Sequence, residues 1–397
     1  MNAGFYIILA AQFLSALADN ALLFAAIALL KELSAPDWHT PLLQEFFIIS
    51  YIVLAPFVGS FADALPKGRV MLIANTIKFV GCTAMWMGMP PLYAYGIVGI
   101  GAAAYSPAKY GILTEYLPHH QLVKANGWME GTTVAAIILG AVVGGILATI
   151  NPHIALAAII ALYMAAAAFN LRIPHVPIDH RMPKRNPLYA LHDFRHSFLA
   201  LWRDPQGKIS LAVTTLFWGA GATMRLVVLA WAAAALNFGL DRATQLTAMV
   251  ALGIAFGSIF AARYVRLQDS VKVLPAGIAM GVMVMMMTLV HDWRIACVLL
   301  FLIGIVSGYF VVPLNALLQH RGHILIGAGH SIAVQNFNEN LGILLMIGAY
   351  TLMVKYELPI NWIVLIFGAF VSLIMTSIYR SHRKQAYADK TPFTTPD

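Results

Sequence analysis

The stretch GSFADALPKGR, residues 59–69, is a short charged break between two long apolar segments. Asp63 closes the first segment, and Lys67, Gly68 and Arg69 open the second. Each neighbouring segment holds roughly 20 mostly apolar residues, the number needed to cross about 30 Å of hydrocarbon. The stretch therefore predicts a tight loop between two antiparallel membrane-spanning helices.

Composition extends this prediction to the whole chain. Of its 397 residues, 60% are hydrophobic and 11% are charged, and the mean hydropathy is +0.77. These values are typical of a protein that is dissolved in a bilayer rather than in water. We expect an all-α polytopic membrane protein with about twelve spans, which lie near residues 5–30, 41–62, 70–88, 91–114, 121–149, 153–172, 209–236, 242–264, 271–290, 294–319, 327–354 and 359–380.

The net charge of +8 is distributed unevenly over the loops. Most basic residues fall in the loops that follow even-numbered spans and in the C-terminal tail, whereas the opposite loops hold only Lys31, Arg242, Arg294 and Lys355. Loops rich in Lys and Arg stay on the cytoplasmic side. We therefore expect both termini in the cytoplasm, and basic residues near anionic lipid head groups rather than on nucleic acid.

Residues 173–208 form the one long break, which is rich in proline, histidine and basic residues and has no span-length apolar run. This central loop divides the chain into an N-terminal six-helix bundle at 1–172 and a C-terminal one at 209–381, with a tail at 382–397.

The second part of the central loop, from Pro187 to Leu201, has the pattern of an amphipathic helix on the inner membrane surface. In that arrangement four apolar side chains face lipid, namely Leu188, Leu191, Phe194 and Phe198. A solvated linker is the alternative.

The two halves carry a weak internal repeat. YSPAKYGILTE and NGWMEGTTVAAIILG in the first half align with FVVPLNALLQ and QNFNENLGILLMIG in the second. In each copy an amide and a carboxylate lie four residues apart, on one helix face. Many secondary transporters are built from duplicated units around a site at the membrane midplane. The alignment pairs Pro107 with Pro313, Lys109 with Asn315, Asn126 with Gln335 and Glu130 with Glu339.

Three carboxylates and three cations fall in the middle of predicted spans: Asp19, Glu130, Glu339, Lys78, Lys109 and Arg225. Each costs roughly 2.5–3.5 kcal/mol at the centre of a spanning helix. We therefore expect a polar pathway through the bundle, and the alternative is a set of ion pairs that hold the halves together. Lys78 is about two turns from Arg69, so we expect it to snorkel to the inner surface.

Residues 59–69 resemble the G-x-x-x-D-x-x-x-G-R/K signature of the major facilitator superfamily. With FLSALADNALLFAAIALL, GAAAYSPAKYGILTE, VKANGWMEGTTVAAIILG, VPLNALLQ and AVQNFNEN, they make the whole chain similar to the bacterial lysophospholipid transporter (LplT) family. The resemblance implies two pseudo-symmetric six-helix bundles in the bacterial inner membrane and inward movement of lysophosphatidylethanolamine and lysophosphatidylglycerol by alternating access. It also implies a functional link to a cytoplasmic-side acyltransferase/acyl-carrier-protein synthetase.

The signature is interpreted as a conformational latch. Asp63 is expected to meet the amino end of a helix in the other half, or a cation there. Gly59 permits close backbone approach, and Lys67, Gly68 and Arg69 complete the motif, with both cations at the lipid surface.

In the superfamily's arrangement, spans 1, 4, 7 and 10 line the cavity and spans 2, 5, 8 and 11 flank it. On this basis we expect Arg225 or Lys109 to bind the substrate phosphate. The remaining candidates are three carboxylates that balance those cations or contact an ammonium, and three amides for glycerol or head-group oxygens: Asp19, Glu130, Glu339, Asn20, Asn315 and Gln335. The acyl chain is expected in the apolar seam between the halves.

A proton-coupled exporter of drugs or small metabolites is the main alternative, with Asp19, Glu130 or Glu339 as the titrating carboxylate. A lipid-modifying enzyme is disfavoured, because no HxxxxD, GxSxG or HExxH pattern occurs. Cys82 and Cys297 form no CxxC pair. We expect a monomer without metal or cofactor.

Overall fold

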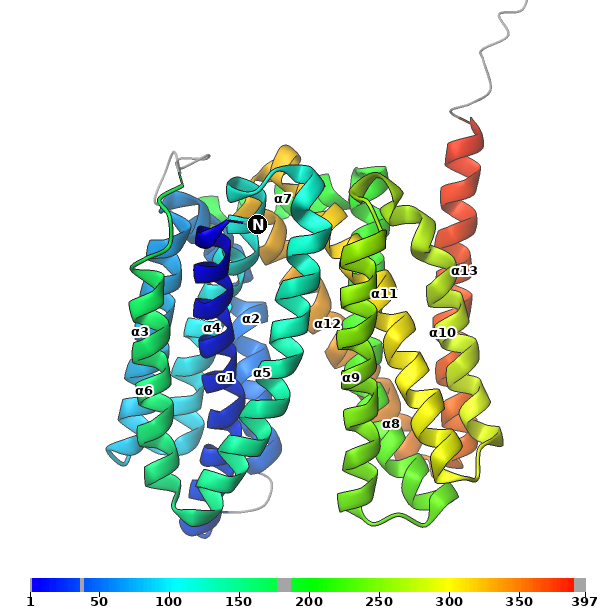
Figure 1. The fold of residues 1–397 in the computed structure, drawn as a ribbon, viewed down its shortest axis with the longest axis horizontal. Helices are drawn as coiled ribbons and strands as arrows, with labels where there is room; N and C mark the ends of the chain where they lie inside the picture. The colour runs from blue at the N-terminus through cyan, green and yellow to red at the C-terminus, as the bar shows by residue number, and fades with distance from the viewer. Residues whose placement is uncertain (1, 36–38, 177–186, 389–397) are drawn as a thin grey trace, which may run out of the picture.

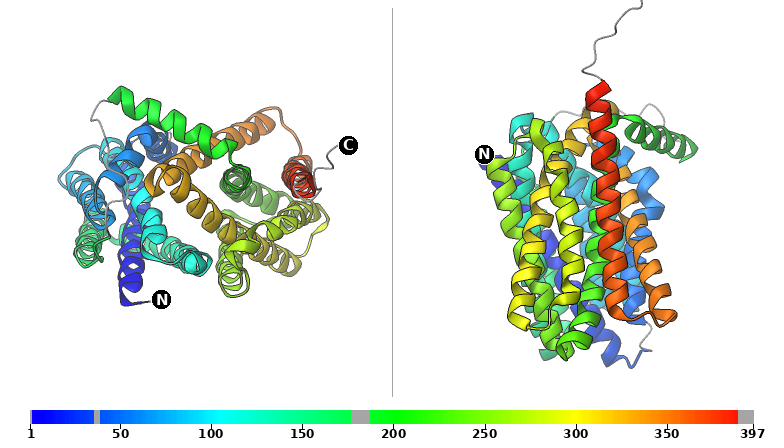
Figure 2. Two further views of the ribbon diagram at one scale, coloured as in Figure 1. Left: turned by 90° about the horizontal axis from the view of Figure 1, so that it is seen from above. Right: turned by 90° about the vertical axis from the view of Figure 1, so that its right-hand side faces the viewer.

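The computed structural model describes residues 2–35, 39–176 and 187–388. Two bundles of long helices stand side by side, and a shorter helix lies across one end of the molecule (Figures 1 and 2). The first bundle holds α1 (Ala3–Glu32), α2 (His39–Ala64), α3 (Lys67–Trp86), α4 (Pro91–Tyr116), α5 (Leu122–Ile150) and α6 (Pro152–Asn170). The second holds α8 (Pro205–Leu236), α9 (Leu240–Tyr264), α10 (Leu274–Met286), α11 (Trp293–Ile326), α12 (Ala328–Lys355) and α13 (Ile360–Ala388).

Helices are the only regular secondary structure of the described residues, and the helices other than α7 match the twelve predicted spans in order. Short 3-10 turns at His119–Gln121, Leu267–Val273 and Met287–Leu289 join or extend them. Ten of the described helices are long and apolar enough to cross a membrane. Of the twelve helices that match predicted spans, the two outside this set are α3 and α4, whose charged, tyrosine and glycine residues lower their hydropathy. The prediction of an all-α, multi-pass membrane protein is confirmed.

Local sequence explains where several helices start. Asn2, Asn151, Asp204 and Asp292 are N-cap residues whose side chains accept hydrogen bonds from backbone N–H groups of the first turn. Gly327 separates α11 from α12 with a φ of +94°. Residues with a side chain rarely adopt this backbone conformation, so a glycine is needed for the sharp turn into α12.

The crossing helix, α7 (Pro187–Arg203), marks what we call the linker end of the molecule. The chain enters α1 and leaves α13 at this same end (Figure 1). Leu188 and Leu191 are exposed. Phe194 and Phe198 instead pack against Phe337 of α12, with ring centroids 5.5 and 6.2 Å apart. The expectation that these two rings face lipid is therefore wrong, because α12 offers them an aromatic partner.

Small residues set the packing inside each half. In the first, Gly140 and Gly144 of α5 lie against α1, and a Cβ on Gly144 would lie 2.6 Å from the Cα of Ala21. In the second, α9 and α11 each carry a G-x-x-x-G pair, Gly253 with Gly257 and Gly304 with Gly308. A Cβ at any of these four positions would overlap a backbone carbonyl of the facing helix.

Gly257→Val is expected to destabilise the second bundle by about 3 kcal/mol, because the added carbons would overlap the carbonyl oxygen of Ile305. The matched control is Gly145→Val in α5, where nothing lies within 4 Å of the new Cβ. Thermal unfolding of the two purified variants, monitored by size-exclusion chromatography, measures the stability of each. Equal melting temperatures for the two variants would contradict the packing assignment.

Candidate functional site

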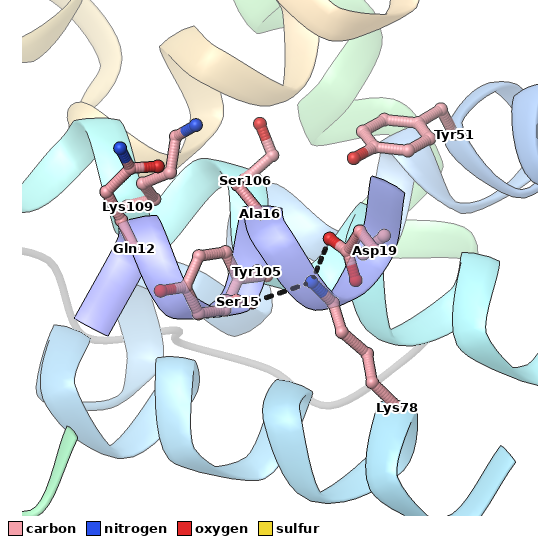
Figure 3. Close-up of a pocket in the computed structure, with 10 residues that line it drawn as sticks. Gln12, Ser15, Ala16, Asp19, Tyr51, Lys78, Tyr105, Ser106 and Lys109 are labelled. Atoms are coloured by element: carbon pink, nitrogen blue, oxygen red, sulfur yellow. Dashed lines mark hydrogen bonds and ion pairs between the residues drawn. The ribbon is translucent and has the colours of Figure 1, made fainter. Parts of the chain in front are cut away.

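The first bundle holds a polar cluster around Asp19 of α1, beside a cavity of about 70 Å³ (Figure 3). The residues that line this cavity come from α1, α2, α3 and α4, and its polar ones are Gln12, Ser15, Asp19, Tyr51, Lys78, Tyr105, Ser106 and Lys109. Gln12, Ser15 and Asp19 share one face of α1, because they are three and four residues apart. The cluster therefore joins four helices through side chains.

Lys78 does not snorkel to the membrane surface, contrary to the sequence prediction. Its side chain is 1% exposed, and Nζ lies 2.6 Å from Asp19 Oδ2 and 3.0 Å from Ser15 Oγ. Nζ also lies 4.6 Å from the centre of the Tyr105 ring. Gly101 lets α4 approach the Lys78 stem closely. The physical reason for the difference is that a carboxylate on another helix compensates the buried ammonium group.

Asp19 is held by more than one partner. Its second oxygen, Oδ1, accepts a hydrogen bond of 2.7 Å from the Tyr163 hydroxyl of α6. The carboxylate is 19% exposed, whereas its partner Lys78 is almost completely buried. Asp19 therefore pairs with Lys78, and not with Lys109 or Arg225 as expected, and keeps one side towards the cavity.

Lys109 and Glu130 belong to an adjacent group between α4 and α5. Lys109 Nζ lies 4.3 Å from the ring centre of Tyr110. The Tyr110 hydroxyl donates to Glu130 Oε1 at 3.2 Å, and Glu130 is 5% exposed. Among the described residues, neither charged group has an ion-pair partner within 4 Å. These two charges are thus less fully compensated than the pair of Asp19 and Lys78.

The second bundle has a buried polar group built from two amides and a carboxylate. Gln335 Nε2 donates to Asn315 Oδ1 at 3.0 Å and to Glu339 Oε1 at 2.7 Å, linking α11 to α12. All three side chains are more than nine-tenths buried. In both halves, a polar residue that follows the helix proline is thus connected to the next helix.

Two candidates lie apart from these clusters. Arg225 of α8 is exposed. It lies on the same helix face as Gly221, where an added Cβ would have no atom within 4 Å. Asn20 donates to the carbonyl oxygen of Ala16 in its own helix at 2.8 Å, and its Cβ faces Gly140 of α5. Neither lines the cavity beside Asp19.

The two halves meet at the linker end. Asp63 of α2 accepts hydrogen bonds from the backbone N–H groups of Gly329 and His330 at 2.7 and 3.0 Å. These groups belong to the first turn of α12, where the helix dipole favours a negative charge. Gly59 permits the approach, since a Cβ there would lie 3.0 Å from the Cα of His330.

Lys67 is 3% exposed and bridges Asp63 at 2.7 Å and Glu115 at 2.9 Å. Its expected place at the lipid surface is wrong, because two carboxylates draw it into the loop. Arg69 is exposed. Gly68 lies against Ile173, where a Cβ would be 3.2 Å from its side chain.

Hydrogen bonds between side chains also join the halves. Asn126 of α5 and Gln319 of α11 exchange hydrogen bonds of 2.9 and 2.8 Å. Asn336 of α12 donates to Ser106 of α4 at 2.9 Å. Away from the linker end, the ribbons of α5 and α9 diverge (Figure 1). The halves are thus held together mainly at one end.

Near the linker end, Asp204, the N-cap residue of α8, forms an ion pair within the second bundle. Arg321 of α11 donates to it through Nε at 3.2 Å. Partial burial acts to raise the pKa of Asp204, but the hydrogen bonds from Arg321 and from the backbone of Gly207 outweigh it and lower the pKa. The stabilisation is therefore present at neutral pH and is lost as acid protonates the carboxylate.

Several residues of these sites were not found from the sequence. The spacing of Gln12, Ser15 and Asp19 was a signal, because polar residues on one face of an apolar helix are unusual. The sequence gives no comparable signal for Tyr163 or His330, because the role of each depends on a hydrogen-bond partner in a distant helix.

The chain is similar over most of its length to known transport proteins. The profile of the Major Facilitator Superfamily matches residues 8–347. The chain is 48% identical to "Lysophospholipid transporter LplT" of Yersinia enterocolitica, covering 91% of this chain and 89% of the relative. It is 47% identical to the protein of that name from Serratia proteamaculans, covering 95% of each.

Solved structures show the same fold at low identity. The transporter FucP "in the outward conformation" superposes with a TM-score of 0.74 at 12% identity, covering 95% of this chain and 98% of FucP. A bacterial homologue of the iron transporter ferroportin "in outward-facing state" gives 0.75 at 14% identity, covering 96% and 99%.

Proposed function

Because the chain belongs to the lysophospholipid transporter (LplT) family of the Major Facilitator Superfamily, we propose that it moves lysophospholipids across a bacterial inner membrane by alternating access. The observation that carries this proposal is the high identity to transporters of that name over nearly the whole chain. The buried polar groups in both halves support it, since a lysophospholipid needs a polar route for its head group.

The linker end is the cytoplasmic side in this proposal. The basic residues of the even-to-odd loops lie there, as the positive-inside rule requires. With the halves joined at this end, the conformation is outward-facing. The route then runs from the outer to the inner leaflet, where a cytoplasmic-side acyltransferase/acyl-carrier-protein synthetase restores the missing acyl chain. The transporter acts as a monomer.

Arg225 is the preferred phosphate ligand. Its side chain is exposed on α8, and it forms no ion pair within 4 Å with another described residue. A guanidinium group offers two parallel N–H donors to a phosphate. Lys109 is the second candidate cation, whereas Lys78 is already committed to Asp19.

Glu130 and Glu339 are candidate partners of a head-group ammonium, with Asn315 and Gln335 beside Glu339. The acyl chain remains in the apolar seams between the halves.

Transfer of lysophospholipids in proteoliposomes tests the function. We expect saturable, protein-dependent transfer of lysophosphatidylethanolamine and lysophosphatidylglycerol, competed by other lysophospholipids and not by diacyl phospholipids. Matched liposomes without protein are the control. Substrate-induced proton flux with small hydrophilic molecules, and no lysophospholipid transfer, would favour a proton-coupled exporter instead.

A further inference from the structure

His330, near the start of α12, lies between two carboxylates from different elements. Its Nδ1 is 2.6 Å from Asp63 Oδ2 in α2, and its Nε2 is 2.8 Å from Asp193 Oδ2 in α7. Ser60 Oγ lies 3.1 Å from the same Nε2. The residue is 9% exposed. One buried ring thus connects both halves of the molecule to the central-loop helix.

The chemistry of this contact specifies the state of the ring. An ionised carboxylate only accepts hydrogen bonds, so each ring nitrogen that faces one must donate a proton. His330 is then an imidazolium with two charge-assisted hydrogen bonds, which are shorter and stronger than neutral ones. Lys67 and Glu115 complete the charged surroundings, because Lys67 bridges Glu115 to Asp63.

Helix α7 is attached to the same region by apolar contacts. Phe194 and Phe198 pack against Phe337, two turns along α12 from His330. Leu201 belongs to a buried cluster with Leu318 and Val334 of the second bundle. Helix α7 also contacts α2 of the first half. Asp193 therefore projects from a helix that packs against both halves, and Figure 2 shows that helix lying across the linker end.

We propose that α7 is a third component of the gate between the halves, acting through the contact of Asp193 with His330. The contact of Asp63 with the first turn of α12 holds the gate directly. Asp193 orients and charges the His330 ring that binds Asp63, so the closed gate is weakened when Asp193 is removed. Asp193 and His330 are positioning residues, and neither lines the cavity beside Asp19.

The distance between the halves at the linker end is the direct readout. Arg172 closely follows the last residue of α6, and Arg380 lies in the last turns of α13; both are exposed, one in each half. Both of these helices end at the linker end (Figure 1). Spin labels at Arg172→Cys and Arg380→Cys, in full-length protein carrying Cys82→Ala and Cys297→Ala, report that distance by double electron–electron resonance in liposomes. The measurement needs no substrate, so it can fail while the proposed function stands.

Asp193→Asn is expected to raise the ratio of long to short distances about tenfold, since one charge-assisted hydrogen bond is lost. Asp193→Glu, which keeps the charge, should restore much of the short-distance population. Asp269→Asn is the matched control, because Asp269 is near the same end but pairs with Arg266 and Lys272 within its own half.

His330→Gln is expected to open the gate further, and adding Asp193→Asn to it should change nothing more, because Asp193 acts through that ring. The proposal is overturned if Asp193→Asn gives the wild-type distances. It is equally overturned if Asp193→Asn has its full effect in the His330→Gln background. If His330→Gln does not fold, the comparison of Asn and Glu at position 193 with the Asp269→Asn control decides the outcome.

Discussion

Asp19→Asn is expected to lower the free energy of unfolding by about 3–5 kcal/mol, because it leaves the Lys78 ammonium buried without a counter-charge. Lys78 is 1% exposed and its Nζ has one carboxylate within 4 Å among the described residues. Native proteins are stable by only about 5–15 kcal/mol, so a loss of this size is a large fraction of the total. Little folded protein should therefore be recovered, as measured by size-exclusion chromatography and thermal unfolding.

The double variant Asp19→Asn with Lys78→Met should recover most of that stability. Replacing both members of a buried pair by neutral groups is often neutral or stabilising. Tyr163→Phe is the milder control, expected to cost about 1 kcal/mol for one hydrogen bond. If Asp19→Asn alone melts like wild type, the pair has no structural role.

The same double variant separates the two roles considered for Asp19. If the carboxylate only compensates Lys78, a folded double variant should transport lysophospholipid at the wild-type rate. If Asp19 also contacts the head group, the double variant should fold but transport slowly. The 19% exposure of Asp19, on the cavity side of the pair, favours the second result.

Arg225→Ala is expected to reduce lysophospholipid transport by about tenfold to a hundredfold, because hydrogen bonds to a charged group contribute about 1.5–3 kcal/mol. Protein abundance should remain normal, since the side chain is exposed and no described carboxylate depends on it. Arg225→Lys should retain part of the activity, as an ammonium attracts phosphate without the two-donor geometry.

Arg294→Ala provides the matched control for Arg225. Arg294 is an exposed arginine at the start of α11, whose guanidinium lies 5.6 Å from the ring of Trp293. Its removal should leave transport unchanged. Wild-type rates for Arg225→Ala, at equal protein levels in the same vesicles, would remove Arg225 from the substrate site.

Hydropathy and charge placement were sufficient to predict the helices. Each span must satisfy its own backbone hydrogen bonds within the bilayer, so its length and composition are a local property of the chain. The twelve long helices and the short turn between α2 and α3 follow from such local properties. The signature also led to Asp63, whose contact at the start of α12 is the one expected of it.

Partners between helices required the folded structure. Lys78 was expected at the surface because its own neighbours in sequence include Arg69, but its carboxylate lies on α1, 59 residues away. His330 was not singled out at all, because Asp63 and Asp193 reach it from 267 and 137 residues away. Sequence patterns report which side chains share one helix face, whereas ion pairing depends on which faces meet. Composition and periodicity therefore specified a bundle of membrane-spanning helices, and the packing of those helices decided which buried charges neutralise each other and which remain open to a ligand.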